Sequence, residues 1–210
     1  MDLKPDFILG DLDALLEHYD KPVDPVSIAK ELDALNPEFK AWLAHVKFIV
    51  LASAGPNGLD CSCRGDENPI FQIIDDTTLL MADWRGNNRI DTLRNLASIP
   101  AIGILCFIPG VGEVLRIGGS ATITIQPDLL DRFARDVKRP RSVIHIKINR
   151  VFFHCARSIK RSSLWDGLFP EDGTVPTAGL MAQAVKNGFD GQAYDAALPD
   201  RQRQTLWSDD

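Results

Sequence analysis

The chain has 210 residues, of which 45% are hydrophobic and 25% are charged, and its formal net charge is −6. This length and composition are typical of a globular domain with a full core. No apolar run reaches the roughly 20 residues of a membrane helix, and the acidic N-terminus lacks the pattern of a secretory signal. The negative charge argues against a general nucleic-acid binder. We therefore expect a cytoplasmic protein with neither a nucleic-acid nor a membrane partner.

From Phe48 onward the hydrophobic period is that of strands joined by short turns. The turn Gly55-Pro-Asn-Gly58 predicts one hairpin, and Asp75-Asp76-Thr77 predicts a second. Gly118 and Gly119 lie inside a long strand and predict a bulge or a sharp bend. We expect strands over residues 47–53, 59–64, 69–74, 78–82, 101–108, 113–125, 142–148 and 151–156, with a turn at Asn149-Arg150.

About eight strands interrupted by few helices predict a mainly β fold with flanking helices, in which an antiparallel sheet closes or nearly closes into a barrel. The barrel is expected over residues 46–165. A helical extension over residues 1–45 is expected to pack on it, and a tail over residues 166–210 to carry one short helix. The sequence contains no internal repeat and no low-complexity run, so we expect a single domain overall.

One loop between a strand and a helix has the features of an anion site. It contains Arg85 and Arg89, and we expect the helix to begin near Arg89 with Asn87 or Asn88 as its N-cap. The first N–H groups of a helix have no internal partner, so an anion placed here would find donors aimed at it. The alternative is that both arginines pair with neighbouring aspartates on a solvated turn.

Further candidate donors lie in three other segments. Ser62 and Arg64 share one side of a predicted strand, and Arg116 lies in an otherwise apolar strand. Residues 155–165 contain three bases, three serines and a Trp, and they overlap the stretch 138–161, which holds eight Lys and Arg and no Asp or Glu. A local basic zone in an acidic protein indicates a discrete anionic ligand. Donors beside a broad aromatic ring suit a phosphorylated, ring-bearing cofactor.

Other chemistries have little support. The four histidines and four cysteines show no metal-ligand spacing, so we expect no metal site and no disulfides. All four cysteines fall in predicted strands, and core filling accounts for them best. The sequence has no nucleophile elbow, no Walker loop and no dinucleotide-binding glycine motif. The catalytic residues, if any, therefore stay unknown.

The candidate segments occur in a characteristic order: Ser62–Asp66, Asp83–Asn95, Leu115–Gly119 and His154–Trp165. Taken together they resemble the pyridoxamine 5′-phosphate oxidase-like family of FMN-binding proteins, over about residues 40–170. The resemblance implies a six-stranded split barrel that works as a homodimer, with FMN in the subunit interface. The arginine and histidine pair with which true pyridoxamine phosphate oxidases hold their substrate is absent from the C-terminal part, which argues against vitamin B6 activity.

The resemblance also implies roles for single residues. Ser62 is expected near the flavin ring, and the second subunit is expected to reach the same flavin with the segment before Trp165. Arg116 is the candidate from the third segment. The implied phosphate contacts are Arg64, Arg85, Asn87, Asn88 and Arg89, and the implied contacts from the second subunit are Lys160, Arg161, Ser162 and Trp165.

We therefore hypothesise an FMN-dependent oxidoreductase of unknown substrate, in which the flavin carries out the electron transfer and the protein positions it. One alternative is a flavin-binding or flavin-sensing module without turnover. Another is the same fold with a deazaflavin or haem in place of FMN.

Overall fold

The computed structural model describes residues 1–84, 86–136 and 138–205. The chain separates into two compact units, Met1–Glu31 and Leu32–Asp210. The first unit contains the 3-10 helix η1 (Pro5–Phe7) and the helices α1 (Leu12–His18) and α2 (Pro25–Ala29), which bury none of their residues. Among the described residues, no helix combines the length and the apolar character that crossing a bilayer requires. The packing of a helical extension on the barrel stays a prediction.

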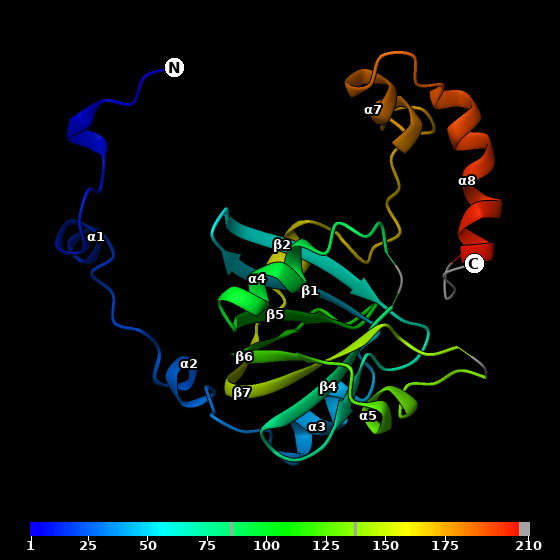
Figure 1. Cartoon of the computed structure of the whole chain (residues 1–210). Coiled ribbons are helices and arrows are strands. Elements are labelled where there is room, and N and C mark those ends of the chain that lie inside the picture. Colours follow the sequence, from blue (N-terminus) through cyan, green and yellow to red (C-terminus); the bar gives the residue numbers. More distant parts are fainter. Residues whose placement is uncertain (85, 137, 206–210) are drawn as a thin grey trace. The chain divides into compact units, whose positions relative to one another are not determined.

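The second unit is built on one antiparallel sheet. Its strand order is β2-β1-β5-β6-β7-β4-β3, so β2 and β3 are edges that do not pair with each other (Figure 1). The predicted mainly β split barrel is thereby confirmed, with seven strands among the described residues in place of about six. The strands are β1 (Phe48–Gly55), β2 (Gly58–Gly65), β3 (Phe71–Ile73), β4 (Thr78–Asp83), β5 (Ala101–Phe107), β6 (Val114–Thr124) and β7 (Ser142–His154).

The last strand corrects the expected turn at Asn149-Arg150. β7 runs without interruption from Ser142 to His154 and pairs with β6 along its length. Gly118 pairs with Arg150 and Gly119 with Ile148, so β7 contains one extra residue at this point. The predicted bulge at the paired glycines is confirmed. A bulge and a turn both interrupt the alternation of side chains, and only the pairing register distinguishes them.

Six helices among the described residues accompany the sheet in this unit. α3 begins at Pro37, where the side chain of Asn36 accepts a hydrogen bond from the Phe39 backbone N–H at 2.7 Å. The tail contains a second helix, α8, which was not predicted. Pro199 lies inside it, and a proline in the sequence argues against the interior of a helix. The helices are α3 (Pro37–Leu43), α4 (Asp91–Ser98), α5 (Pro127–Asp131), α6 (Arg157–Arg161), α7 (Ala178–Val185) and α8 (Gly191–Thr205).

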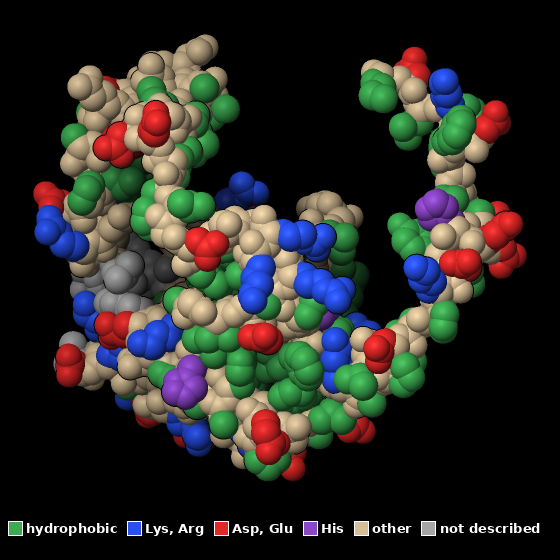
Figure 2. All heavy atoms as spheres, turned by 180° about the vertical axis from the view of Figure 1, so that it is seen from behind, with side chains coloured by type: hydrophobic (Ala, Val, Ile, Leu, Met, Phe, Trp, Pro, Cys, Tyr) green, Lys and Arg blue, Asp and Glu red, His purple; other side chains and the backbone are tan. Residues whose placement is uncertain are grey.

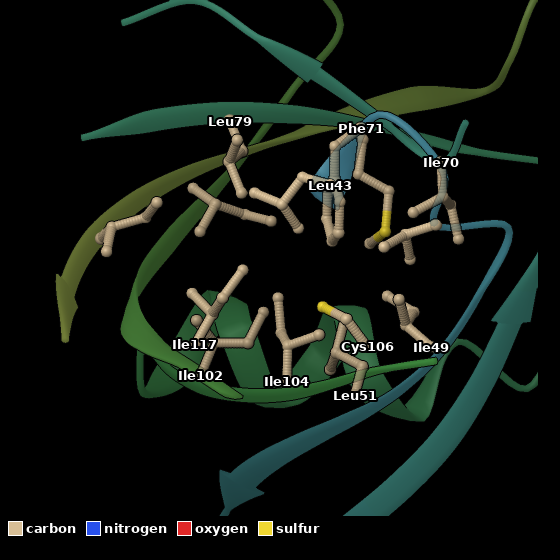
Figure 3. Close-up of a cluster of buried hydrophobic side chains, with 14 of the residues drawn as sticks. Leu43, Ile49, Leu51, Ile70, Phe71, Leu79, Ile102, Ile104, Cys106 and Ile117 are labelled. Carbon is tan, nitrogen blue, oxygen red and sulfur yellow. The ribbon is translucent and has the colours of Figure 1, made fainter. Parts of the chain in front are cut away.

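The core fills the barrel interior with side chains at alternate strand positions. Ile49, Leu51 and Ile104 are buried on β1 and β5, and Figure 3 shows that side chains from facing strands point toward one another. Cys106 belongs to this core, and its burial raises the pKa of its thiol. The prediction that the other three cysteines also fill the core is wrong, because they are exposed. Cys61 and Cys63 alternate with inward-facing residues on an edge strand, so their side lies outside the core.

The turn between β3 and β4 is held by the carboxylate of Asp75. It accepts hydrogen bonds from the Thr77 backbone N–H and from the Thr78 hydroxyl, both at 2.8 Å. These bonds, with the Thr77 backbone bond first, lower the pKa of Asp75 from 3.8 to about 2. The unfolded chain therefore binds more protons between these two values, and folding stability contributed by Asp75 is lost as the pH falls through that window.

We expect Asp75→Asn to remove this part of the acid sensitivity. Thermal unfolding between pH 5 and pH 2 should give a steeper loss of Tm for the wild type than for Asp75→Asn, because asparagine keeps an acceptor but does not titrate. Asp172→Asn, at an exposed position, provides the control and should follow the wild-type profile. Parallel profiles for the wild type and Asp75→Asn would show that titration of Asp75 does not contribute to the acid sensitivity.

Candidate functional site

A cleft with a volume of about 1250 Å³ lies where the barrel is open. It is lined by both edge strands, through residues such as Arg64 of β2 and Gln72 of β3. The end of β4, residues 86–90 and the first turn of α4 complete much of the lining. Because the two edges do not pair, the interior of the barrel is accessible here.

Ser62 and Arg64 project into this cleft from β2. They pair with Leu51 and Ile49 of β1, whose side chains belong to the core, so they lie on the inner face of the sheet. Arg64 Nη1 donates to Ser62 Oγ and, at 2.9 Å, to the carbonyl oxygen of Cys63. The predicted neighbourhood of a hydroxyl and a guanidinium group on one side of the strand is therefore present.

Asn87, Asn88 and Arg89 line the same cleft, whereas Arg85 lies outside the described residues. The expected helix start is wrong: α4 begins at Asp91, and its N-cap position is Ile90, which makes no side-chain capping bond. Asn88 has a φ of 59° and Ile90 a φ of 51°. This left-handed conformation is common for asparagine but energetically costly for a β-branched residue such as isoleucine. Residues 88–90 therefore do not form the first turn of α4.

Arg89 has a carboxylate partner in this loop. Its Nε donates to the carboxylate of Asp91 at 2.7 Å, and its side chain is 75% exposed. The alternative of a solvated ion pair is therefore present for Arg89. An anion in the cleft has to share this guanidinium group with Asp91.

The segment after α5 forms another part of the lining, which sequence reasoning did not include. Arg132 Nε donates to Gln72 Oε1, and Gln72 Nε2 donates to the Arg132 carbonyl oxygen, both at 2.8 Å. Arg135 forms ion pairs with Asp66 and Glu67. The segment is thereby fastened to β3 and to the loop after β2, with the charge of Arg135 neutralised.

Charges in the described lining are balanced. Among the described residues, no carboxylate lies within ion-pair distance of Arg64, and its hydrogen bonds go to uncharged oxygens. Its positive charge is therefore available to a ligand. The lining holds five arginines, Arg64, Arg89, Arg132, Arg135 and Arg141, and five acids, Asp60, Asp66, Glu67, Asp83 and Asp91.

Three further residues at the end of β4 and the start of β7 were missed from the sequence as site residues. Arg141 Nη1 donates to Asn88 Oδ1 at 3.0 Å, and Ser142 pairs with Asp83 across the two strands. Burial raises the pKa of the Asp83 carboxyl, against the opposing effect of the Arg64 and Arg141 charges. The sequence signal for Arg141 was the stretch 138–161, which has no Asp or Glu. Within that stretch, only Lys160 and Arg161 were predicted to contact the ligand.

The remaining candidates do not line this cleft. Arg116 pairs with Phe152 on the outer face of the sheet, 5.0 Å from the centre of its ring, and its Nη1 lies 3.0 Å from Nε2 of His154. Lys160, Arg161 and Ser162 lie in or after α6, and Trp165 Nε1 donates to the Val111 carbonyl oxygen at 2.9 Å. Figure 2 shows a group of Lys and Arg side chains on one face of the barrel unit. A single chain therefore brings together only part of the predicted set.

A comparison with protein families finds that the model described as pyridoxamine 5′-phosphate oxidase matches residues 35–155. A comparison with curated proteins gives no match. Among solved structures, HupZ from Group A Streptococcus is 18% identical over 57% of this chain and 93% of its own, with a TM-score of 0.47. An FMN-binding protein from Syntrophomonas wolfei is 12% identical over 52% and 78%, with a TM-score of 0.40. Similarities this distant transfer neither a ligand nor an activity.

Proposed function

Because the chain belongs to the pyridoxamine 5′-phosphate oxidase family, we propose that it binds FMN in the cleft between β2 and β3. The observation that carries the proposal is Arg64, whose charge has no carboxylate partner among the described residues and lies in a cleft large enough for a nucleotide. Side-chain amides of Asn87 and Asn88 and the guanidinium group of Arg89 supply further donors. Arg85 stays a proposed contact on sequence grounds alone.

The proposed site includes a second copy of the chain. The outer face of the sheet presents apolar side chains that are only partly buried, among them Phe48, Leu105 and Phe107, where a solvated face would be polar. Arg116 lies on this face next to Leu105. We propose a homodimer in which this face packs on its symmetry mate and brings Arg116, Lys160, Arg161, Ser162 and Trp165 to the flavin of the partner.

The proposed activity is that of an oxidoreductase of unknown substrate. Bound FMN supplies hydride or electron transfer, and the residues of the chain supply position and charge complementarity. Arg64 and Arg89 hold the phosphate end, while the fastening of the segment after α5 by Arg132 and Arg135 keeps one wall of the cleft in place. Cytoplasmic location is part of the same proposal.

The absorption spectrum of the purified protein tests the cofactor. We expect flavin bands, release of FMN on heating at about one per chain, and a mass in solution of two chains. A Soret band would assign haem in place of FMN. A colourless protein that takes up no added FMN would contradict the proposal, and FMN that binds but is reoxidised by no acceptor would favour the binding-module alternative.

A further inference from the structure

The inner end of the cleft carries a pair of polar side chains next to the apolar core. Asp83 and Ser142 are register partners on β4 and β7, immediately beyond the pair Met81 and Ile144 on the same face. Met81 and Ile144 are fully buried in the core. Asp83 and Ser142 therefore project to the barrel interior, the face from which Arg64 projects on β2.

Ser142 has a hydroxyl group that the protein does not satisfy. The residue is only 5% exposed, it lines the cleft, and its Oγ has no hydrogen-bond partner among the described residues. A buried hydroxyl without a partner is costly, and native structures keep few of them. Its position in the wall of a cleft indicates that a ligand supplies the partner.

Asp83 places an acceptor beside this hydroxyl. Paired residues on antiparallel strands have side chains about 4.5 to 5.5 Å apart, so one ligand edge can reach both. At this pair, an anionic group in addition to the phosphate expected at Arg64 is disfavoured by the Asp83 carboxyl. A cationic group is disfavoured by the charges of Arg64 and Arg141. What suits the pair is an uncharged edge with an N–H donor next to a carbonyl acceptor.

We propose that Asp83 and Ser142 recognise the imide edge of the flavin ring, with the carboxyl of Asp83 accepting from the ring N–H and the hydroxyl of Ser142 donating to a neighbouring ring carbonyl. This inference rests on the proposed function, since it assigns the ring end of the ligand whose phosphate end Arg64 binds. It makes the two residues determinants of ring specificity, separate from the phosphate contacts.

Fluorescence titration of the full chain with FMN, and with FMN methylated at the imide nitrogen, tests the pair. The wild type should bind FMN about tenfold more tightly than methylated FMN, as loss of one hydrogen bond to a charged group implies. Asp83→Ala should weaken FMN binding about three- to tenfold and leave binding of methylated FMN unchanged, because methylation already removes the N–H that Asp83 accepts from. Ser142→Ala should weaken binding of FMN and of methylated FMN about three- to tenfold, because both keep the ring carbonyl. Ser142→Thr restores a hydroxyl and should recover part of the loss.

A stability measurement separates recognition from a structural role. Ligand-free Ser142→Ala should have a Tm equal to or above that of the wild type, because it removes an unsatisfied buried hydroxyl. Ser120→Ala, exposed on β6, serves as the control and should bind both ligands normally. Wild-type FMN affinity in both Ser142→Ala and Asp83→Ala would overturn this inference alone. Failure of the wild type to bind FMN would overturn the proposed function together with it.

Discussion

Gly119→Ala is expected to destabilise the protein by about 3 kcal/mol or more. A Cβ atom at this position would overlap the carbonyl oxygen of Lys147 and lie 3.0 Å from its carbonyl carbon. Both atoms belong to the backbone of β7, which pairs with β6 in the middle of the sheet, so neither can rotate away. Relief requires the two strands to separate at the bulge.

Gly118→Ala is the matched control. Its Cβ would have Asn149 Oδ1 as nearest neighbour at 3.6 Å, which is ordinary contact, and the change should alter the free energy of unfolding by less than about 1 kcal/mol. Urea unfolding of both variants at one pH gives the comparison. Equal losses at Gly118 and Gly119 would show that loss of glycine itself, and not the close approach of β7, determines the effect.

Arg64→Ala should weaken FMN binding by about 1.5 to 3 kcal/mol, the range for hydrogen bonds to charged groups, which corresponds to roughly 10- to 150-fold in Kd. Arg89→Ala is expected in the same range, at its lower end, because Arg89 is exposed and already paired with Asp91. Titration with FMN and with riboflavin measures the effect. Riboflavin lacks the phosphate, so its affinity should change little in either variant.

Arg94→Ala provides the control for charge alone. Arg94 is exposed on α4 and does not belong to the cleft lining, so its removal should leave both affinities unchanged. If Arg64→Ala lowered the affinities for FMN and riboflavin equally, Arg64 would contact another part of the ligand. A similar loss in Arg94→Ala would point to the overall field of the protein in place of a direct contact.

The phosphate end and the ring end of the proposed site can be tested independently. Arg64→Ala is expected to weaken binding of FMN but not of riboflavin, whereas Ser142→Ala is expected to weaken binding of both, because both ligands have the ring carbonyl. The two residues lie on strands that are not neighbours in the sheet, β2 and β7. Arg64 and Ser142 share no hydrogen-bond partner among the described residues and are proposed to contact different ends of the ligand. The Arg64→Ala, Ser142→Ala double variant should therefore show about the sum of the two losses.

The sequence by itself determined most of the strands, the bulge at Gly118-Gly119 and the loop that carries Asn87 to Arg89. These features depend on neighbours in the chain: side chains alternate along a strand, and glycines mark the places where backbones approach closely. The same local signals left two errors. Asn149-Arg150 has the composition of a turn, and Asn87 and Asn88 have the composition of an N-cap, yet pairing with β6 and a left-handed Ile90 decided otherwise.

Only the tertiary structure decided which polar groups meet in the cleft. Asp83 and Ser142 are 59 positions apart, and they become neighbours through the register of β4 and β7. The same folding places Arg116 on the outer face, away from Arg64 on the inner face. Pairing register fixes the face of every side chain on a strand, and register is a long-range property set by the barrel core. That is why the sequence predicted the kinds of residues in the site, while their grouping required the fold.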